Sequence, residues 1–315
     1  ATTGPQGDRI QTAMTDKPVS AEMAANAVFL SGIEKSDLHI VDELIQERCP
    51  SFVNHWTWPV ARPLLYSLLG YDNARTMADH LMTLNGEKSF DYLSEKLDMR
   101  VSSAGIENLP REGRVIVAAN HPTGLADGIA VWDALRSVRK DIVVFANADA
   151  VRVNPRFTDV IIPVEWLMDK RSPAKTRETL RRAAAAFSEE KCVVIFPSGK
   201  LARMIDGALW EQPWFTTVVG LAKKQGAPIC PLNVKARNSR LFYFFSKVNG
   251  ELRDITLFHE LLNKRRSRFE LTFGPLIQPS ALTGPGQDVT DALKAFIAYE
   301  LAGKPKLDFP ALPAA

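Results

Sequence analysis

The chain has 315 residues, of which 46% are hydrophobic and 24% are charged. This composition is that of an ordinary globular protein, and it excludes a disordered, collagen-like or coiled-coil chain. The 39 Lys and Arg residues outnumber the 36 Asp and Glu residues by only three, which is too balanced for a protein whose main ligand is a nucleic-acid backbone. We therefore expect no nucleic acid among its partners.

The chain has three cysteines, Cys49, Cys192 and Cys230, and no Cys-x-x-Cys motif. This pattern argues against both a disulfide scaffold and a cysteine-rich zinc site, so we expect reduced thiols in the cytoplasm. The start of the chain is polar, without the apolar stretch of a signal peptide. We expect residues 1–19 to be a tail whose first part precedes the native start at Met14.

Residues 20–98 are predicted to be helical throughout, because apolar positions recur there at intervals of three and four residues. The most apolar stretch, 56–71, contains Arg62 and two prolines and is shorter than the roughly 20 residues that cross a membrane. One interpretation is an interfacial helix with aromatic anchors. The other is a helix packed on the core of the domain that follows.

From Arg114 onward, short β-branched runs alternate with helical stretches. Four runs are apolar enough to be strands that are covered on both faces. A fifth run, 268–274, alternates apolar and polar residues, which is typical of a strand nearer an edge. The four buried runs are 114–120, 141–147, 191–197 and 228–236.

The helices between these strands have recognisable ends. Ser172 and Pro173 form an N-cap and first-turn pair that begins a helix ending near Glu190. Pro213 is predicted to begin another helix, which Gly226 ends.

The alternation of strands and helices predicts an α/β domain over 99–303 with a mostly parallel central sheet flanked by helices. The helical region, 20–98, precedes this domain. The last helix is expected to end at Gly303, and 304–315 is predicted to be a loose tail.

Two predicted strands end in residues that can do chemistry. The strand over 114–120 runs directly into His121, and Asp127 follows six positions later, while the third buried strand runs into a turn at 197–200. Ligands collect beyond the carboxyl ends of strands in such a sheet, so neighbouring strands would bring these groups into one cleft. A carboxylate that orients an imidazole makes it a general base. The alternative is that the histidine caps a helix and that 197–200 is an ordinary turn.

Three segments resemble the glycerolipid (lysophospholipid) acyltransferase superfamily: NHPTGLADG at 120–128, VIFPSGKLAR at 194–203 and APICPLNV at 227–234. The superfamily's first block is His-x4-Asp. The His-x5-Asp spacing found here is similar to the branch labelled hemolysin-like or lyso-ornithine-lipid acyltransferase. The resemblance covers about 105–277 and implies the same α/β fold.

The chain departs from the superfamily pattern in the third block, which is usually Phe-Pro-Glu-Gly-Thr-Arg. Ser198 stands in place of the glutamate and Leu201 in place of the arginine, while Arg203 matches the arginine of the branch. The arginine of the second block cannot be located around 162–165. These departures leave the head group of the acceptor open.

The resemblance implies transfer of a fatty acyl group from acyl-CoA or acyl carrier protein to a hydroxyl of a lysolipid or glycerolipid precursor. His121 would be the general base and Asp127 would orient it, with no cofactor and no metal. Backbone amides near Ser198 and Gly199 are the candidate donors to the oxyanion. The residues expected to bind substrate are Asn120, Gly124, Gly128, Phe196, Pro197, Ser198, Gly199, Lys200, Arg203 and Pro231.

Lys200 and Arg203 are candidates for binding phosphate or carboxylate, and the alternative is that both are solvated surface cations. A lysolipid is poorly soluble, so we expect peripheral association with the inner face of the membrane. Two alternatives remain: a thioesterase or lipid hydrolase that uses the same pair of residues, and a lipid-binding scaffold without activity. A serine hydrolase is disfavoured because the chain has no Gly-x-Ser-x-Gly motif.

Overall fold

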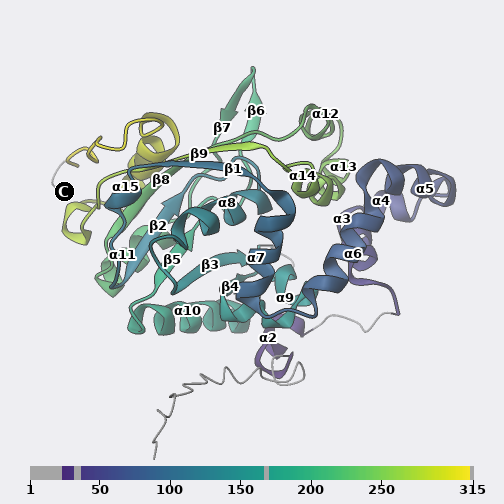
Figure 1. The fold of residues 1–315 in the computed structure, drawn as a ribbon, viewed down its shortest axis with the longest axis horizontal. Helices are drawn as coiled ribbons and strands as arrows, with labels where there is room; N and C mark the ends of the chain where they lie inside the picture. Colours follow the sequence, from purple (N-terminus) through teal and green to yellow (C-terminus); the bar gives the residue numbers. More distant parts are fainter. Residues whose placement is uncertain (1–22, 32–36, 167–169, 313–315) are drawn as a thin grey trace, which may run out of the picture.

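The structure is a computed structural model that describes residues 23–31, 37–166 and 170–312. Within these ranges, seven strands form one sheet in the order β1-β9-β8-β2-β5-β3-β4, and every neighbouring pair is parallel except β8 and β9 (Figure 1). The strands are β1 (Arg100–Ala104), β2 (Val115–Ala119), β3 (Ile142–Asn147), β4 (Ile161–Val164), β5 (Cys192–Ile195), β8 (Ile229–Lys235) and β9 (Arg268–Phe273). A separate antiparallel hairpin, β6 (Arg203–Ile205) and β7 (Ala208–Trp210), projects from the top of the molecule in Figure 1.

Helices precede the sheet and surround it. Those before the first strand are α2 (Ala27–Leu30), α3 (Ile40–Arg48), α4 (Pro50–Val53), α5 (Trp58–Leu69), α6 (Tyr71–Leu81) and α7 (Gly86–Leu97). Those within the α/β region are α8 (Leu125–Leu135), α9 (Asp149–Val153), α10 (Pro173–Ser188), α11 (Thr217–Gln225), α12 (Arg240–Val248), α13 (Gly250–Ile255), α14 (Leu257–Leu262) and α15 (Gly286–Ala295). Short turns are η1 (Ile106–Asn108), η2 (Pro155–Asp159), η3 (Pro279–Ala281) and the π-helical η4 (Phe296–Glu300).

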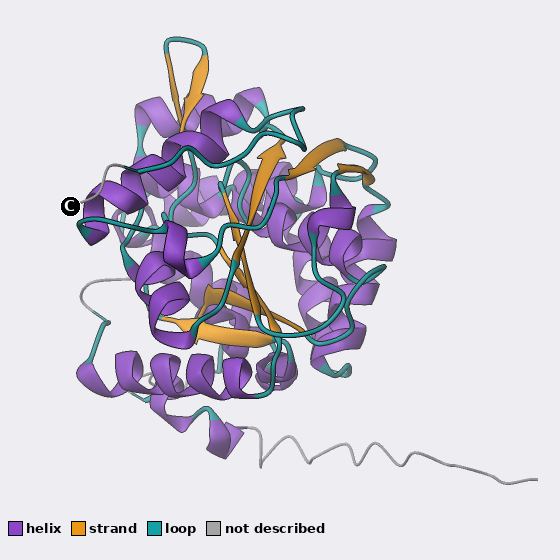
Figure 2. Ribbon diagram, turned by 90° about the vertical axis from the view of Figure 1, so that its left-hand side faces the viewer, coloured by secondary structure: helices purple, strands orange, loops and turns teal. Residues whose placement is uncertain are grey.

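The sheet is buried on both faces, as the continuous apolar runs predict. Along β2, Val117 and Ala119 pack into a core with side chains of α7 and α8, whereas Ile116 and Ala118 pack into a second core with side chains of α10, α11 and α15. Figure 2 shows the strands enclosed between helices. The α/β fold with its helical N-terminal region is therefore the predicted one.

The five predicted strands are present to within one or two residues as β2, β3, β5, β8 and β9. Two edge strands were not predicted. Strand β1 is mostly exposed and contains Ser102 and Ser103, and β4 has only four residues, one of them Pro163. Neither strand carries the long apolar run or the regular alternation that signals a strand in a sequence.

The ends of the helices agree only in part with the sequence prediction. The Ser172 side chain accepts a hydrogen bond from the backbone N–H of Lys175 at the start of α10, and α11 ends before Gly226 at φ 60°. The predicted start of α11 at Pro213 is wrong, because this helix begins at Thr217. The Phe215 N–H donates to the Pro197 carbonyl at 3.0 Å, which holds the preceding segment against the turn after β5.

The prediction of a loose C-terminal tail is wrong for residues 304–312. Leu307 and Leu312 pack against the core beside α10 and α11, and the Phe309 ring lies edge-on to Phe296 with centroids 5.4 Å apart. The Asn108 side-chain amide also donates to the Pro305 carbonyl at 3.0 Å. The aromatic and aliphatic residues of the tail therefore extend the core.

The N-terminal helices form their own small core, in which residues of α3, α5 and α6 pack together with Ile255 of α13. One face of helix α5 packs on this cluster rather than on the core around the sheet, and the other face is bare. The bare face carries Val60, Leu64 and Leu68, which are 82%, 76% and 52% exposed, and Trp56, which is 83% exposed, lies in the turn before the helix. Among the described residues, no helix has both the length and the apolar character needed to span a bilayer.

Candidate active site

The site forms where β2 and β5 end side by side. The two strands are parallel neighbours, with Ala118 in register with Ile195, so the prediction that these strand ends adjoin is confirmed. His121 follows β2 directly, and Asp127 lies in the first turn of α8. Nδ1 of the imidazole lies 3.0 Å from Oδ2 of the carboxylate.

Asp127 is completely buried and is held by its own loop. Its Oδ2 accepts the backbone N–H groups of Thr123 at 2.8 Å and Gly124 at 2.9 Å, and its Oδ1 accepts the Thr123 hydroxyl. The N-terminal end of a helix also favours negative charge. The carboxylate is thus fixed before any substrate arrives.

The imidazole of His121 presents one edge inward and one outward. Its ring lies against Phe196, with centroids 4.4 Å apart and planes tilted by 31°. Nδ1 is buried and lies within ion-pair distance of Asp127, although off the line of a good hydrogen bond. The side chain is 18% exposed, and because Nδ1 is buried the exposed edge is the one that carries Nε2. A proton held on Nδ1 leaves Nε2 as an outward-facing base.

The turn after β5 is closed by a tryptophan. Gly199 has φ 58°, and a Cβ at this position would lie 1.9 Å from a ring carbon of Trp166. The Trp166 ring stacks in turn on Phe215, with centroids 6.4 Å apart. The Gly199 N–H donates to the Phe196 carbonyl at 3.0 Å. The expectation that this amide binds an oxyanion is therefore wrong, because its hydrogen closes the turn.

Apart from the glycines, the remaining predicted site residues fall into three groups. Phe196, Pro197 and Ser198 are buried at the end of β5 beside His121. Lys200 and Arg203 are exposed, the latter at the start of the β6–β7 hairpin.

The third group belongs to the framework of the site. Asn120 exchanges hydrogen bonds with the backbone of Val234, donating at 2.9 Å and accepting at 2.7 Å, and so ties the end of β2 to β8. Pro231 is buried within β8 in register with Ala118, which makes it part of the sheet rather than a substrate contact.

Two glycines of the first block begin α8. Gly124 has φ 97°, and a Cβ there would lie 3.2 Å from the Leu201 side chain. This close approach lets the segment after β5 pack on the start of α8. Gly128 has open space where a Cβ would stand, so its lack of a side chain relieves no contact inside the protein.

Three residues of the site were not predicted from the sequence. They are Trp166, Glu211 and Asn238, and each comes from a segment far along the chain from His121. Asn238 donates to the Thr123 carbonyl at 3.2 Å, while its own Oδ1 is buried without a hydrogen-bond partner among the described residues. No spacing rule in the sequence connects such residues with the first block.

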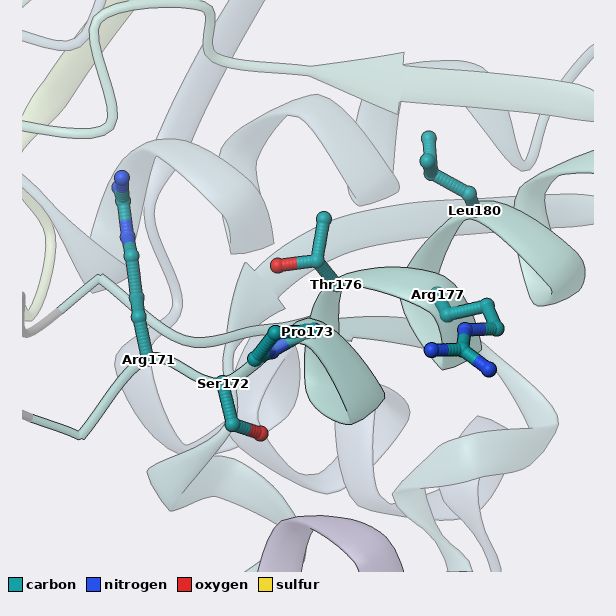
Figure 3. A pocket seen from close by; sticks show the side chains of 6 residues that line it. All are labelled: Arg171, Ser172, Pro173, Thr176, Arg177 and Leu180. Carbon is teal, nitrogen blue, oxygen red and sulfur yellow. The ribbon is translucent and has the colours of Figure 1, made fainter.

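A surface depression lies at the start of α10, away from the predicted site residues. Figure 3 shows that Arg171 and Arg177 extend on either side of Pro173. The Arg171 guanidinium lies 5.8 Å from the centre of the Phe215 ring, so a row of aromatic contacts runs from this depression to the turn at Gly199. Within the described ranges, no group of three or more His, Cys, Asp and Glu side chains is arranged to hold a metal ion.

Comparison with known proteins shows which family this part of the chain is similar to. Residues 100–235 match the family model described as Acyltransferase. This part of the α/β domain is therefore similar to that family. The matched range contains both His121 and Asp127 as well as the turn after β5.

Two curated proteins that are similar to this chain are named lyso-glycine lipid O-acyltransferase. The protein of Phocaeicola vulgatus is 26% identical over 186 residues, a match that spans 57% of this chain and 65% of the relative. The protein of Bacteroides thetaiotaomicron is 25% identical over 186 residues, spanning 57% of this chain and 66% of the relative. The chain thus matches just under two thirds of the length of these relatives.

A solved structure is also similar. It is the crystal structure of the 1-acyl-sn-glycerophosphate (LPA) acyltransferase PlsC from Thermotoga maritima, with a TM-score of 0.42 and 14% sequence identity. The similarity covers 89% of this chain and 95% of the other.

Proposed function

We propose that this protein transfers a fatty acyl group from a thioester, carried by coenzyme A or acyl carrier protein, to the hydroxyl of a lysolipid, with His121 as the general base. The observation that carries the proposal is the geometry of the imidazole. Nδ1 faces a buried carboxylate at 3.0 Å, and the opposite edge of the ring faces outward. The acyltransferase family model over 100–235 supports the reaction class.

The reaction needs a base because a neutral alcohol is a weak nucleophile. Nε2 of His121 takes the hydroxyl proton while the alcohol oxygen forms a bond to the thioester carbonyl carbon. The tetrahedral intermediate then collapses as the carbon–sulfur bond breaks, and the departing sulfur takes the proton from the imidazolium. The products are an ester and a free thiol, and Asp127 stabilises the imidazolium between the two steps.

The oxyanion of the intermediate needs hydrogen-bond donors. Since the Gly199 N–H is engaged within its turn, we assign this role to the neighbouring Ser198 amide. The Ser198 hydroxyl donates to the Lys200 carbonyl at 2.8 Å, and this contact helps to keep the turn in one conformation.

We further propose an acceptor with an anionic head group of the amino-acid lipid type. Both curated relatives are named for a lyso-glycine lipid, and a lipid with a free amino-acid carboxylate carries negative charge at its head. Lys200 and Arg203 are exposed cations on the segment that follows the turn. They can meet such a head group while its hydroxyl reaches His121.

The test is release of free thiol from acyl-CoA and from acyl-acyl carrier protein, with and without an added lysolipid. We expect release that depends on the acceptor, and we expect His121→Ala to lower kcat by about two to four orders of magnitude, the usual contribution of a general base. The Lys224→Ala variant, which changes an exposed residue of α11, is the matched control. Thiol release that needs no acceptor would identify a hydrolase, and near-normal activity of folded His121→Ala would overturn the role of the imidazole.

We propose peripheral association with the membrane through α5. Its bare face carries apolar side chains at every fourth position from Val60 to Leu68, and the exposed Trp56 directly precedes the helix, which is the pattern of a helix that lies in the membrane interface. Arg62 lies on the same helix, with its guanidinium 5.9 Å from the centre of the Tyr66 ring. Because the lipid substrate resides in a bilayer, this contact would bring the enzyme to it at the inner face of the membrane.

A further inference from the structure

A second carboxyl group reaches the site from outside the motif blocks. Glu211 follows β7 directly, and it is only 7% exposed. Its Oε2 accepts the backbone N–H of His121 at 3.2 Å, and its Oε1 accepts the indole N–H of Trp214 at 3.1 Å. The carboxyl group therefore bridges His121 and the buried Trp214, which precedes α11.

The segment 202–211, which carries Glu211, forms hydrogen bonds with both backbone groups of His121. While the His121 N–H donates to the carboxyl group, the His121 carbonyl accepts the N–H of Ala202 at 2.9 Å. The Glu211 N–H donates to the Tyr299 hydroxyl at 3.0 Å, which anchors this side of the site to η4. The backbone of His121 is thus fixed by residues that lie about 80 to 90 positions later in the chain.

Burying a carboxyl group costs free energy unless its oxygens are paired. Burial raises the pKa of Glu211 above its ordinary value, and hydrogen bonds from Trp214 and the His121 N–H oppose the rise. A glutamate that served only to fill space could be replaced by an apolar residue without this cost. The Glu211 oxygens are instead paired with donors of His121 and Trp214, which ties the carboxyl group to the histidine of the proposed reaction.

We infer that Glu211 is a positioning residue for the acyl transfer, holding His121 by its backbone and adding a second negative charge behind the imidazole. This inference rests on the proposed function. The groups that face the His121 and Glu211 pair are Asp127 from α8, Ser198 from the turn after β5, Trp214 before α11 and Tyr299 from η4. The acid groups among them are the two carboxyls, and the cations Lys200 and Arg203 are exposed to solvent.

Glu211 is proposed to have two effects: it holds the backbone of His121 and it adds a negative charge. The Glu211→Gln variant, combined with Trp214→Phe, separates these two effects. A glutamine has one acceptor oxygen for the two N–H donors of His121 and Trp214. In Glu211→Gln alone, either N–H group can lose its partner. In Trp214→Phe/Glu211→Gln the indole donor is gone, so the amide oxygen is free to accept the His121 N–H. Trp214→Phe alone is the reference for this double variant.

We expect Glu211→Gln to lower kcat by about ten-fold to a hundred-fold, because displacement of a reacting group by a fraction of an ångström has effects of this size. KM for the acyl donor should change less than kcat. The double variant should recover the kcat of Trp214→Phe. In both variants the acidic limb of the kcat/KM profile should move to lower pH, because loss of an anion disfavours protonation of the nearby imidazole.

Three outcomes would overturn the inference: an unchanged kcat in Glu211→Gln, a loss of kcat that the double variant does not recover, or an acidic limb that stays in place. If Glu211→Gln does not fold, the double variant and its reference give the same test of the acidic limb. An NMR titration of the His121 ring in wild type and Glu211→Gln requires no substrate. It therefore tests the contact even if the protein released no thiol, which would refute the proposed function instead.

Discussion

At the scale of single residues, Asp127 has two tasks that compete for its oxygens. It faces Nδ1 of His121, and it also accepts two backbone N–H groups and a hydroxyl from the loop between β2 and α8. The same carboxylate therefore faces the imidazole and closes the turn in which the imidazole stands. A change at this position acts on both stability and activity.

We expect Asp127→Asn to lower kcat by about two orders of magnitude or more, because an amide cannot stabilise the imidazolium as a carboxylate does. Folding stability should fall by about 1–3 kcal/mol, since the amide NH2 would face buried donors. Activity assays and urea unfolding measure the two effects. Asp133→Asn is the matched control, because Asp133 lies on the same helix and accepts the Ser94 hydroxyl outside the site. Equal activity losses in both variants would contradict a catalytic role for Asp127.

At the scale of structural elements, the residues of the site lie in the loops and turns that follow the strands rather than in the strands themselves. The loop after β2 supplies His121 and the turn after β5 supplies Ser198, and Trp166 closes that turn from the segment after β4. The strands determine where these loops start. The Trp166 ring covers the turn at Gly199, and its stacking on Phe215 holds it there.

We expect Gly199→Ala to destabilise the protein by about 2–4 kcal/mol. The positive φ costs about 1 kcal/mol for a residue with a Cβ, and a further 1–3 kcal/mol arises because the methyl group overlaps the Trp166 ring. Thermal unfolding measures the change, and the activity should fall with it. Gly207→Ala is a matched control, since Gly207 has φ 80° but open space around it. If both variants lost the same stability, the close packing of Trp166 on Gly199 would add nothing to the cost of a Cβ at position 199.

The elements that the sequence predicted are those with local signals. Strands β2, β3, β5 and β8 are apolar because they are buried on both faces, and Ser172 marks the start of α10 by its own hydrogen bond. His121 and Asp127 are close in sequence, so their spacing is visible in a motif. Glu211 and Trp166 reach the same site through tertiary packing, and a contact between residues 90 positions apart leaves no periodicity to detect.

At the scale of the whole molecule, the α/β domain and the N-terminal helices have different surfaces. The sheet is enclosed by helices, whereas α5 stands at the edge of the molecule with a bare apolar face (Figure 1). Contiguous exposed apolar side chains of this kind mark sites of contact with lipid or protein. The opposite face of α5 packs on the cluster of α3 and α6, so the helix is held in place without the bilayer.

We expect the Val60→Asp/Leu64→Asp variant to lose binding to vesicles of phosphatidylcholine and phosphatidylglycerol by about ten-fold or more. Each of these side chains contributes roughly 1.5–3 kcal/mol when it leaves water, and the aspartates would add repulsion from the anionic lipid. Co-sedimentation measures the binding. Leu180→Asp changes an exposed leucine of α10 and should leave the binding unchanged.

Activity on a detergent-dispersed lysolipid should survive in Val60→Asp/Leu64→Asp while activity on vesicles falls, because α5 supplies contact with the bilayer and no group of the active site. Equal vesicle binding by Leu180→Asp, Val60→Asp/Leu64→Asp and wild type would exclude α5 as the membrane contact.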